Sequence, residues 1–168
     1  MNIRSVVSAL AMVAATRVAT AQSITIADRD RIEAEVRTVF ESELVAAREG
    51  NVESVAATWS AEDGICVWQG VIESCHHVLA SYRNAWSSSA VERPLRQERE
   101  GTMVRVFVLS ATVALVATAT SVNRSFLANG DVSTARFGGL FVYVLENGSW
   151  RFHSGAQSAW AIDTLNGR

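Results

Sequence analysis

The sequence predicts an α+β fold in which helices pack on one side of an antiparallel sheet. In the first half of the chain, apolar residues recur at the three-to-four-residue spacing of amphipathic helices. The second half contains long runs rich in valine, threonine and aromatic residues, which are typical of strands. The last two runs flank Asn147 and Gly148, a residue pair that strongly favours a two-residue hairpin turn.

Three helices are expected, in residues 30–48, 52–59 and 74–86. The first is long and amphipathic, with its apolar stripe formed by Ile32, Val36, Val39, Phe40, Leu44 and Ala47. Gly50 is expected to end this helix, while Asn51 and Ser74 are suited to cap the second and third helices.

A short hairpin is expected in residues 65–68 and 71–73, followed by two long strands in residues 95–109 and 112–122. In the terminal hairpin, counting outward from Asn147-Gly148 pairs Leu145 with Trp150 and Tyr143 with Phe152. The same count pairs Phe141 with Ser154. It therefore places Phe141, Tyr143, Phe152, Ser154 and Ala156 on one face, and His153 with Gln157 on the other.

The chain has 168 residues, enough for one domain, expected in residues 22–168. Residues 1–21 have a basic start, an apolar run and a small-x-small ending at Ala21, the pattern of a secretory signal peptide. The protein is then exported, periplasmic or secreted; the alternative is an apolar N-terminal helix of the fold. The apolar run is too short to leave a membrane anchor in the mature chain.

The formal net charge is −2, and loss of Arg4 and Arg17 with the signal peptide would make it −4. A mildly acidic domain gives no electrostatic reason to expect a nucleic-acid partner. The chain contains no lysine, which excludes Schiff-base catalysis on a lysine.

Cys66 and Cys75 flank the short hairpin. A turn centred on Gly70 and Val71 would place them opposite one another, but Cys75 at the start of a helix would change that geometry. The sequence leaves open a disulfide or two semi-buried thiols. Two cysteines and an adjacent histidine pair offer too few ligands for a metal site, and no cofactor is expected.

The order and spacing of several local motifs resemble the nuclear transport factor 2-like superfamily and, within it, the SnoaL-like group. The resemblance covers nearly the whole mature chain and rests on the helix end Ala47-Arg48-Glu49-Gly50-Asn51-Val52-Glu53, on Trp59 followed by Asp63-Gly64, on Gly70, on the strand pair of residues 104–116, and on the ending Asn147-Gly148-Ser149-Trp150-Arg151-Phe152.

This resemblance implies a cone, in which a strongly curved sheet wraps around the long helix and encloses a pocket open at one end. Members of the superfamily include ketosteroid isomerases, polyketide cyclases, dehydratases and pocket domains without known activity. Catalytic members usually move a proton with an Asp or His in the pocket. Many relatives have a histidine near the end of the last strand, where this chain has Ala156.

Four residues are candidates for catalysis: Asp63, His153, Arg105 and Tyr82. Asp63 is the candidate general base, against the alternative of a plain Asp-Gly turn. His153 serves proton transfer only if its face of the hairpin lines the pocket. Arg105 interrupts an apolar strand and must pair with a carboxylate, such as Glu73, Glu98 or Glu100, or bind an anionic ligand.

The candidate pocket residues are Trp59, Trp68, Tyr82, Trp86, Phe141, Tyr143, Phe152 and Ser154. Aromatic side chains in this pattern suit a flat apolar ligand, although the same pattern is also typical of an ordinary core.

Three functions are consistent with these residues. The first is an exported pocket domain that binds a small apolar or aromatic molecule without changing it. The second is an isomerase, cyclase or dehydratase, and the third is a structural dimerisation module. The long strands are apolar on both faces, so a homodimer through the outer face of the sheet is also expected.

Overall fold

The long N-terminal helix is the element against which the rest of the chain packs. The computed structural model describes residues 24–68, 70–87, 96–126 and 130–165, so the predicted signal peptide lies outside the described residues. Helix α2 (Ile26–Glu49) begins at Thr25, whose side chain accepts a hydrogen bond from the Asp28 amide, and ends at Gly50 with φ 71°. The helix therefore starts four residues before the predicted residue 30, because Thr25 supplies the cap.

Two shorter helices follow, as predicted. Helix α3 (Val52–Ala57) is capped by Asn51, whose side chain accepts from the Ser54 amide. Helix α4 (Cys75–Ser87) is capped by Ser74, whose hydroxyl oxygen accepts from the His77 amide at 3.2 Å. Both predicted caps are confirmed.

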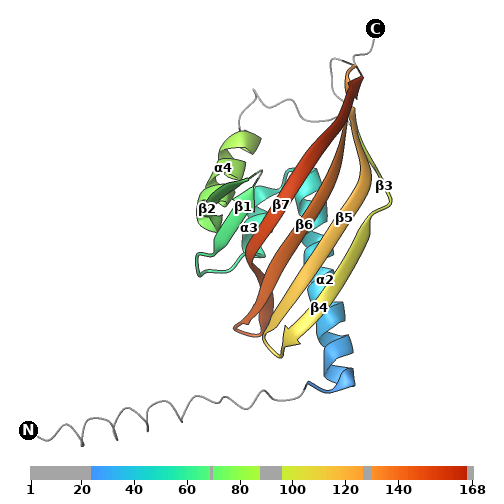
Figure 1. Cartoon of the computed structure of the whole chain (residues 1–168). Coiled ribbons are helices and arrows are strands. Elements are labelled where there is room, and N and C mark those ends of the chain that lie inside the picture. Colours follow the sequence, from blue (N-terminus) through green and yellow to red (C-terminus); the bar gives the residue numbers. More distant parts are fainter. Residues whose placement is uncertain (1–23, 69, 88–95, 127–129, 166–168) are drawn as a thin grey trace, which may run out of the picture.

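The described strands form one sheet in the order β2-β1-β7-β6-β5-β3, with β4 also paired to β5. Their bounds are β1 (Ile65–Trp68), β2 (Val71–Ser74), β3 (Arg96–Glu100), β4 (Met103–Ser110), β5 (Val113–Phe126), β6 (Val132–Glu146) and β7 (Ser149–Leu165). The single strand predicted over residues 95–109 is wrong: Gly101, with φ 64°, separates β3 from β4. Figure 1 shows α2 along one face of the curved sheet, with α4 and β2 on the β7 side of the sheet.

One strand pair in this sheet is parallel. β1 runs beside β7, with Cys66 opposite Gly155 and Trp68 opposite Gln157. Gly64, just before β1, lies so close to β7 that a Cβ there would be 1.9 Å from the His153 carbonyl oxygen. The absence of a side chain at Gly64 is what permits this approach.

The terminal hairpin has the predicted turn, with both Asn147 and Gly148 at positive φ, and the predicted register near the turn. Tyr143 pairs with Phe152, but Val142 pairs with Ser154, so His153 is an extra residue on β7. This β-bulge shifts the pairing by one residue and exchanges the faces beyond it. The predicted pairing of Phe141 with Ser154 is therefore wrong, and Gly155 lies opposite Phe141.

The register predicted for the cysteine hairpin is also wrong. Trp68 pairs with Val71, which puts Cys66 opposite Glu73 rather than opposite Cys75. Cys75 is the first residue of α4, and its sulfur nevertheless lies 2.06 Å from that of Cys66. The start of the helix, not the strand ladder, brings the two sulfur atoms together.

The core lies between the helices and the inner face of the sheet. Ile32, Val36 and Phe40 of α2 are buried there with Val116, Tyr143 and Phe152 of the sheet. In the described part of the chain, no helix combines the length and apolar character needed to cross a bilayer.

Candidate functional site

A cavity of about 160 Å³ opens in the core between α2, the two shorter helices and the strands β1, β6 and β7. Its walls are mostly apolar and aromatic, formed by Phe40, Glu43, Ala47, Val55, Trp59, Cys66, Val67, Trp68, Val78, Tyr82, Phe141, Tyr143, Phe152, Gly155 and Gln157.

Six of the eight predicted pocket residues line this cavity: Trp59, Trp68, Tyr82, Phe141, Tyr143 and Phe152. Ser154 does not, because the bulge at His153 turns it to the other face and brings Gly155 and Gln157 inward. The side chain of Trp86 lies outside the described residues.

The aromatic rings pack against one another around the cavity. The ring centroids of Trp59 and Phe152 are 4.6 Å apart, and the rings of Trp68 and Tyr82 meet edge to face at 5.5 Å. Phe141 is 6.2 Å from Phe152 and 5.8 Å from Phe40. These contacts fix the shape of the walls, since aromatic pairs favour tilted and edge-to-face geometries.

Glu43 of α2 is the carboxylate in the wall of this apolar cavity. Its Oε1 accepts a hydrogen bond from Trp59 Nε1 at 3.0 Å, and its Oε2 accepts from the Tyr143 hydroxyl at 2.9 Å. A carboxylate has about four acceptor positions. Trp59 and Tyr143 hold the group in a fixed orientation, Thr58 is a further donor, and acceptor capacity still remains for a molecule in the cavity.

Burial raises the pKa of Glu43, while the hydrogen bonds from Trp59, Tyr143 and Thr58 act in the opposite direction. Desolvation disfavours the charged carboxylate, whereas donors favour it. Burial also raises the pKa of Tyr82, and the nearby Glu43 charge adds to that effect. The cavity thus holds a carboxyl group that takes up a proton more readily than an exposed glutamate.

Glu43 was not among the residues predicted from the sequence for this site. It lies three residues after Phe40 and four before Ala47, so it falls within the apolar stripe of α2. A charged residue within an apolar stripe can indicate a functional group that faces the core. At Glu43 this signal was hidden, because Leu44 continues the apolar stripe at the next position.

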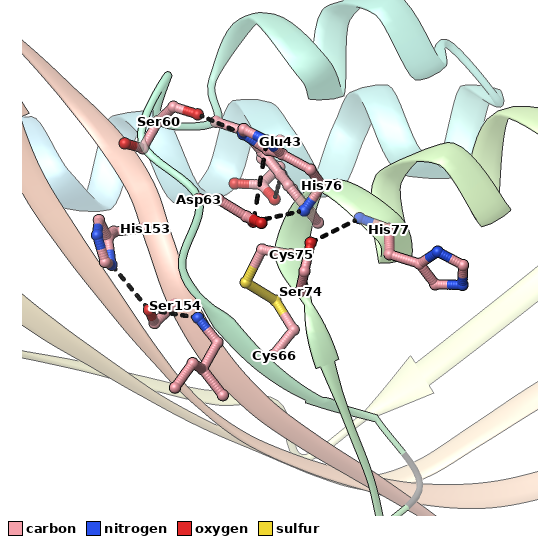
Figure 2. Close-up of a disulfide and its surroundings, with 12 residues drawn as sticks. Glu43, Ser60, Asp63, Cys66, Ser74, Cys75, His76, His77, His153 and Ser154 are labelled. Carbon is pink, nitrogen blue, oxygen red and sulfur yellow. Dashed lines mark hydrogen bonds and ion pairs between the residues drawn. A yellow bond between two sulfur atoms is a disulfide. The ribbon is translucent and has the colours of Figure 1, made fainter.

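Asp63 lies outside this cavity, in the turn before β1. Its Oδ1 accepts from the backbone amide of His76 at 3.0 Å, as Figure 2 shows. Hydrogen bonds from Ser74 and His76 lower the pKa of Asp63, the reverse of what a general base for carbon acids needs. The turn interpretation fits this position.

His153 is not among the residues that line the cavity. Its Nδ1 lies 2.7 Å from the Ser154 hydroxyl oxygen, which also accepts from the Ile65 amide at 3.2 Å (Figure 2). The Ser154 hydroxyl therefore joins β1 to the bulged part of β7, and His153 contacts that hydroxyl.

Arg105 is exposed on β4, where it pairs with Ala117 of β5. Among the described residues, no carboxylate forms an ion pair with it. Glu73 lies on β2, and Glu100 pairs with Arg124 instead. Of the four predicted catalytic residues, only Tyr82 lines the cavity.

The Cys66–Cys75 pair joins β1 to α4 at the wall of the cavity (Figure 2). Cys66 contributes to the lining, and Val78 and Tyr82 follow Cys75 on the same helix. The pair thus fixes the position of α4 against the cavity. Within the described ranges, no three His, Cys, Asp or Glu residues gather in a way that could hold a metal ion.

Neither the known family models nor the curated proteins give a match to this chain. Solved structures do. A ketosteroid isomerase-like protein from Erwinia carotovora atroseptica SCRI1043 is 21% identical with a TM-score of 0.57, covering 77% of this chain and 95% of that one.

Two further solved structures align with the chain. Hexachlorocyclohexane dehydrochlorinase LinA-type3 from Novosphingobium barchaimii LL02 is 14% identical with a TM-score of 0.66, covering 86% of this chain and 97% of that one. An NTF2-like family protein from Streptomyces avermitilis is 19% identical with a TM-score of 0.62, covering 78% and 97%. At these identities the likeness concerns the fold.

Proposed function

We propose that this chain, which has the nuclear transport factor 2-like cone fold, binds a small apolar or aromatic molecule in the cavity of its cone. The observation that carries the proposal is the cavity itself, enclosed by aromatic side chains and containing one carboxyl group. Small-molecule sites are typically concave and apolar with a few placed polar groups.

The size of the cavity limits the ligand. A volume of about 160 Å³ is close to that of an engineered apolar cavity of about 150 Å³ that binds benzene. The part of the ligand that enters is therefore about the size of one aromatic ring. Glu43 would accept a hydrogen bond from a polar group of that ligand.

A cavity-filling variant tests this proposal. Ala47 lines the cavity, so Ala47→Leu would occupy part of it, whereas Val45→Leu adds bulk at an exposed site on the same helix. Toluene should raise the melting temperature of the wild type and of Val45→Leu, but not of Ala47→Leu, because binding to the folded state stabilises it. Mass spectrometry of molecules retained from a metabolite extract would then identify natural ligands.

An equal response of the two variants to toluene would contradict the proposal. A wild type that neither responds to toluene nor retains a small molecule would instead support a cone filled by its own side chains.

Glu43 supports a second candidate function, proton transfer to or from the bound molecule. A desolvated carboxyl group with a raised pKa is suited to act as a general base beside a carbonyl. Trp59 and Tyr143 would hold it in place during the transfer. An isomerase, cyclase or dehydratase would need such a group.

Hydrogen–deuterium exchange of the methyl group of acetophenone in D₂O, followed by NMR, tests this candidate. The wild type should accelerate exchange, and Glu43→Gln should lose about 100-fold or more of that acceleration. Glu35→Gln is the matched control. Glu35 lies on the same helix as Glu43, and it also accepts a hydrogen bond from a tryptophan, Trp150 Nε1, at 3.0 Å. Acceleration that survives in Glu43→Gln would exclude Glu43 as the base.

We also propose that the protein is exported and that Cys66 and Cys75 form a disulfide in the mature chain. An oxidising compartment favours such a bond, and the proximity of the two residues, whose Cα atoms are 5.0 Å apart, supports it. N-terminal sequencing should find Gln22 as the first residue. The mass of the denatured mature protein should not change with iodoacetamide until a reductant is added.

A homodimer through the outer face of the sheet is proposed as well. Met103, Phe107, Leu109 and Leu140 are exposed there, and the helices lie against the other face (Figure 1). Light scattering should give the mass of a dimer for the wild type and of a monomer for Leu140→Glu. Ile26→Glu, at an 80% exposed residue of α2, should remain dimeric. A monomeric wild type would contradict this assignment.

A further inference from the structure

A second cavity, of about 80 Å³, adjoins the first one. Phe40, Phe141 and Gln157 line both cavities, so the two cavities meet at these side chains. The rings of Phe40 and Phe141, with centroids 5.8 Å apart, form the apolar part of this junction.

The chemistry of the second cavity differs from that of the first. Its lining includes Arg99 of β3 and the hydroxyl groups of Thr102, Thr118 and Thr120. The hydroxyl oxygens of Thr102 and Thr120 are 3.3 Å apart. Together with the Gln157 amide, these hydroxyl groups provide hydrogen-bond donors in the same cavity as the guanidinium cation of Arg99.

Arg99 is held in place by one hydrogen bond. Its Nε donates to Asn123 Oδ1 at 3.2 Å, and Asn123 is itself buried. This contact fixes the plane of the guanidinium and leaves its terminal nitrogens for another partner.

No carboxylate of the described residues forms an ion pair with Arg99, whereas Arg31, Arg37, Arg83 and Arg124 have acidic partners. The charge of another arginine, Arg48 at the end of α2, acts on Arg99. Partial burial lowers the pKa of Arg99, and the charge of Arg48 lowers it further. A positive site that already repels another cation is favourable for an anion.

We propose that Arg99 binds the carboxylate of an amphipathic ligand whose apolar part occupies the first cavity. The ligand is then a small aromatic or apolar carboxylic acid. This inference rests on the proposed binding function and names its ligand class. A guanidinium fork matches a carboxylate with two parallel hydrogen bonds. Arg99 is exposed as well as lining the second cavity, so the acid can reach it from solvent.

The two charged groups of the site do not compete for the same part of the ligand. Glu43 lines the first cavity and Arg99 lines the second, and the two cavities meet at Phe40 and Phe141. The carboxylate of the ligand therefore avoids Glu43, and a ligand is oriented with its apolar end toward the helices α3 and α4.

Calorimetric titration with 3-phenylpropionate and with its neutral analogue 3-phenylpropanol tests this inference. The wild type should bind the acid about tenfold or more tightly than the alcohol. Arg99→Gln should bind both with affinities within about twofold of each other, while its affinity for the alcohol stays at the wild-type value. Arg105→Gln is the control, because Arg105 is exposed and lines neither cavity.

The outcomes separate this inference from the function on which it rests. Binding of the alcohol without any preference for the acid would overturn the role of Arg99 and leave the binding function in place. Binding of neither probe would contradict both. A preference for the acid that is lost equally in Arg105→Gln would show a general effect of net charge and would overturn the Arg99 site.

Discussion

At the scale of single residues, Glu43 makes stability depend on pH in a definite direction. Burial raises its pKa in the folded state above the value of an exposed glutamate. Between the unfolded and folded pKa values, the folded protein binds more protons than the unfolded chain. The free energy of unfolding therefore falls as pH rises through this window, and the contribution is fully present only below the unfolded pKa.

Glu43→Gln should remove this pH-dependent contribution to the free energy of unfolding. We expect the variant to lose less stability than the wild type when pH is raised from about 4 to 7, because glutamine carries no charge to bury. Urea unfolding at a series of pH values measures the difference. Glu35→Gln should change the profile with the opposite sign, since hydrogen bonds from Trp150 and Arg31 lower the pKa of Glu35. Parallel profiles for wild type and Glu43→Gln would contradict the assignment.

Gly64 gives a second prediction at this scale. A Cβ at this position would lie 1.9 Å from the His153 carbonyl oxygen and 2.5 Å from Ser154 Oγ, so β1 would have to move away from β7. Gly64→Ala should lower the free energy of unfolding by about 2 to 4 kcal/mol. Gly70→Ala is the comparison, because a Cβ there has open space and meets only the strain of φ 84°.

Chemical denaturation of both variants measures these costs. Gly70→Ala should lose about 1 kcal/mol, the cost of a left-handed conformation. A loss in Gly64→Ala no larger than that would mean that the two strands separate easily.

At the scale of elements, the sequence predicted what local chemistry determines. Helix caps and the Asn147-Gly148 turn depend on residues within a few positions, and the structure has them. The bulge at His153 lies where β1, a segment distant in sequence, comes beside β7, and no pattern within the hairpin reveals it. The break at Gly101 has a local signal, a glycine within a strand pattern, but the apolar run on its far side obscured it.

The difference between local and long-range contacts also explains which residues of the site could be predicted from the sequence. The aromatic walls were predicted because Tyr143 and Phe152 lie between the turn and the bulge, where the register is simple. Ser154 lies beyond the bulge and was assigned to the wrong face. Glu43 was missed because its role depends on Trp59 and Tyr143, which approach it from distant parts of the chain.

Two glycines on the long strands accommodate the ring of Phe141. A Cβ at Gly155 would lie 2.8 Å from Phe141 Cδ1 and 2.9 Å from Phe152 Cε2, and one at Gly139 would lie 2.5 Å from Phe141 Cζ. Gly155→Ala should therefore displace the ring, lower the free energy of unfolding by about 1 to 3 kcal/mol and weaken toluene binding. Ala156→Val, at the exposed neighbour, should leave toluene binding unchanged. Calorimetry and urea unfolding test both variants, and unchanged toluene binding in Gly155→Ala would contradict the role of this glycine.

At the scale of the whole molecule, the proposed disulfide between Cys66 and Cys75 would close a loop with a sequence separation of 9. Cross-linking a loop of this length limits the unfolded chain and should stabilise the fold by about 2 to 3 kcal/mol. Urea unfolding with and without a reductant measures this, with thiol titration to show that both cysteines have been freed. Full reduction without a change in midpoint would contradict the prediction.

The bulge at His153 also determines how β7 would respond to a scan in which each position is changed in turn to aspartate. Before the bulge, the even-numbered positions Trp150 and Phe152 are buried, whereas beyond it the odd-numbered positions Gly155 and Gln157 line the cavity. Between residues 149 and 159, tolerance should alternate with a period of two on each side of the bulge, with its phase reversed at residue 153. A mutational profile alone, obtained without coordinates, would thereby locate this one-residue insertion in the strand.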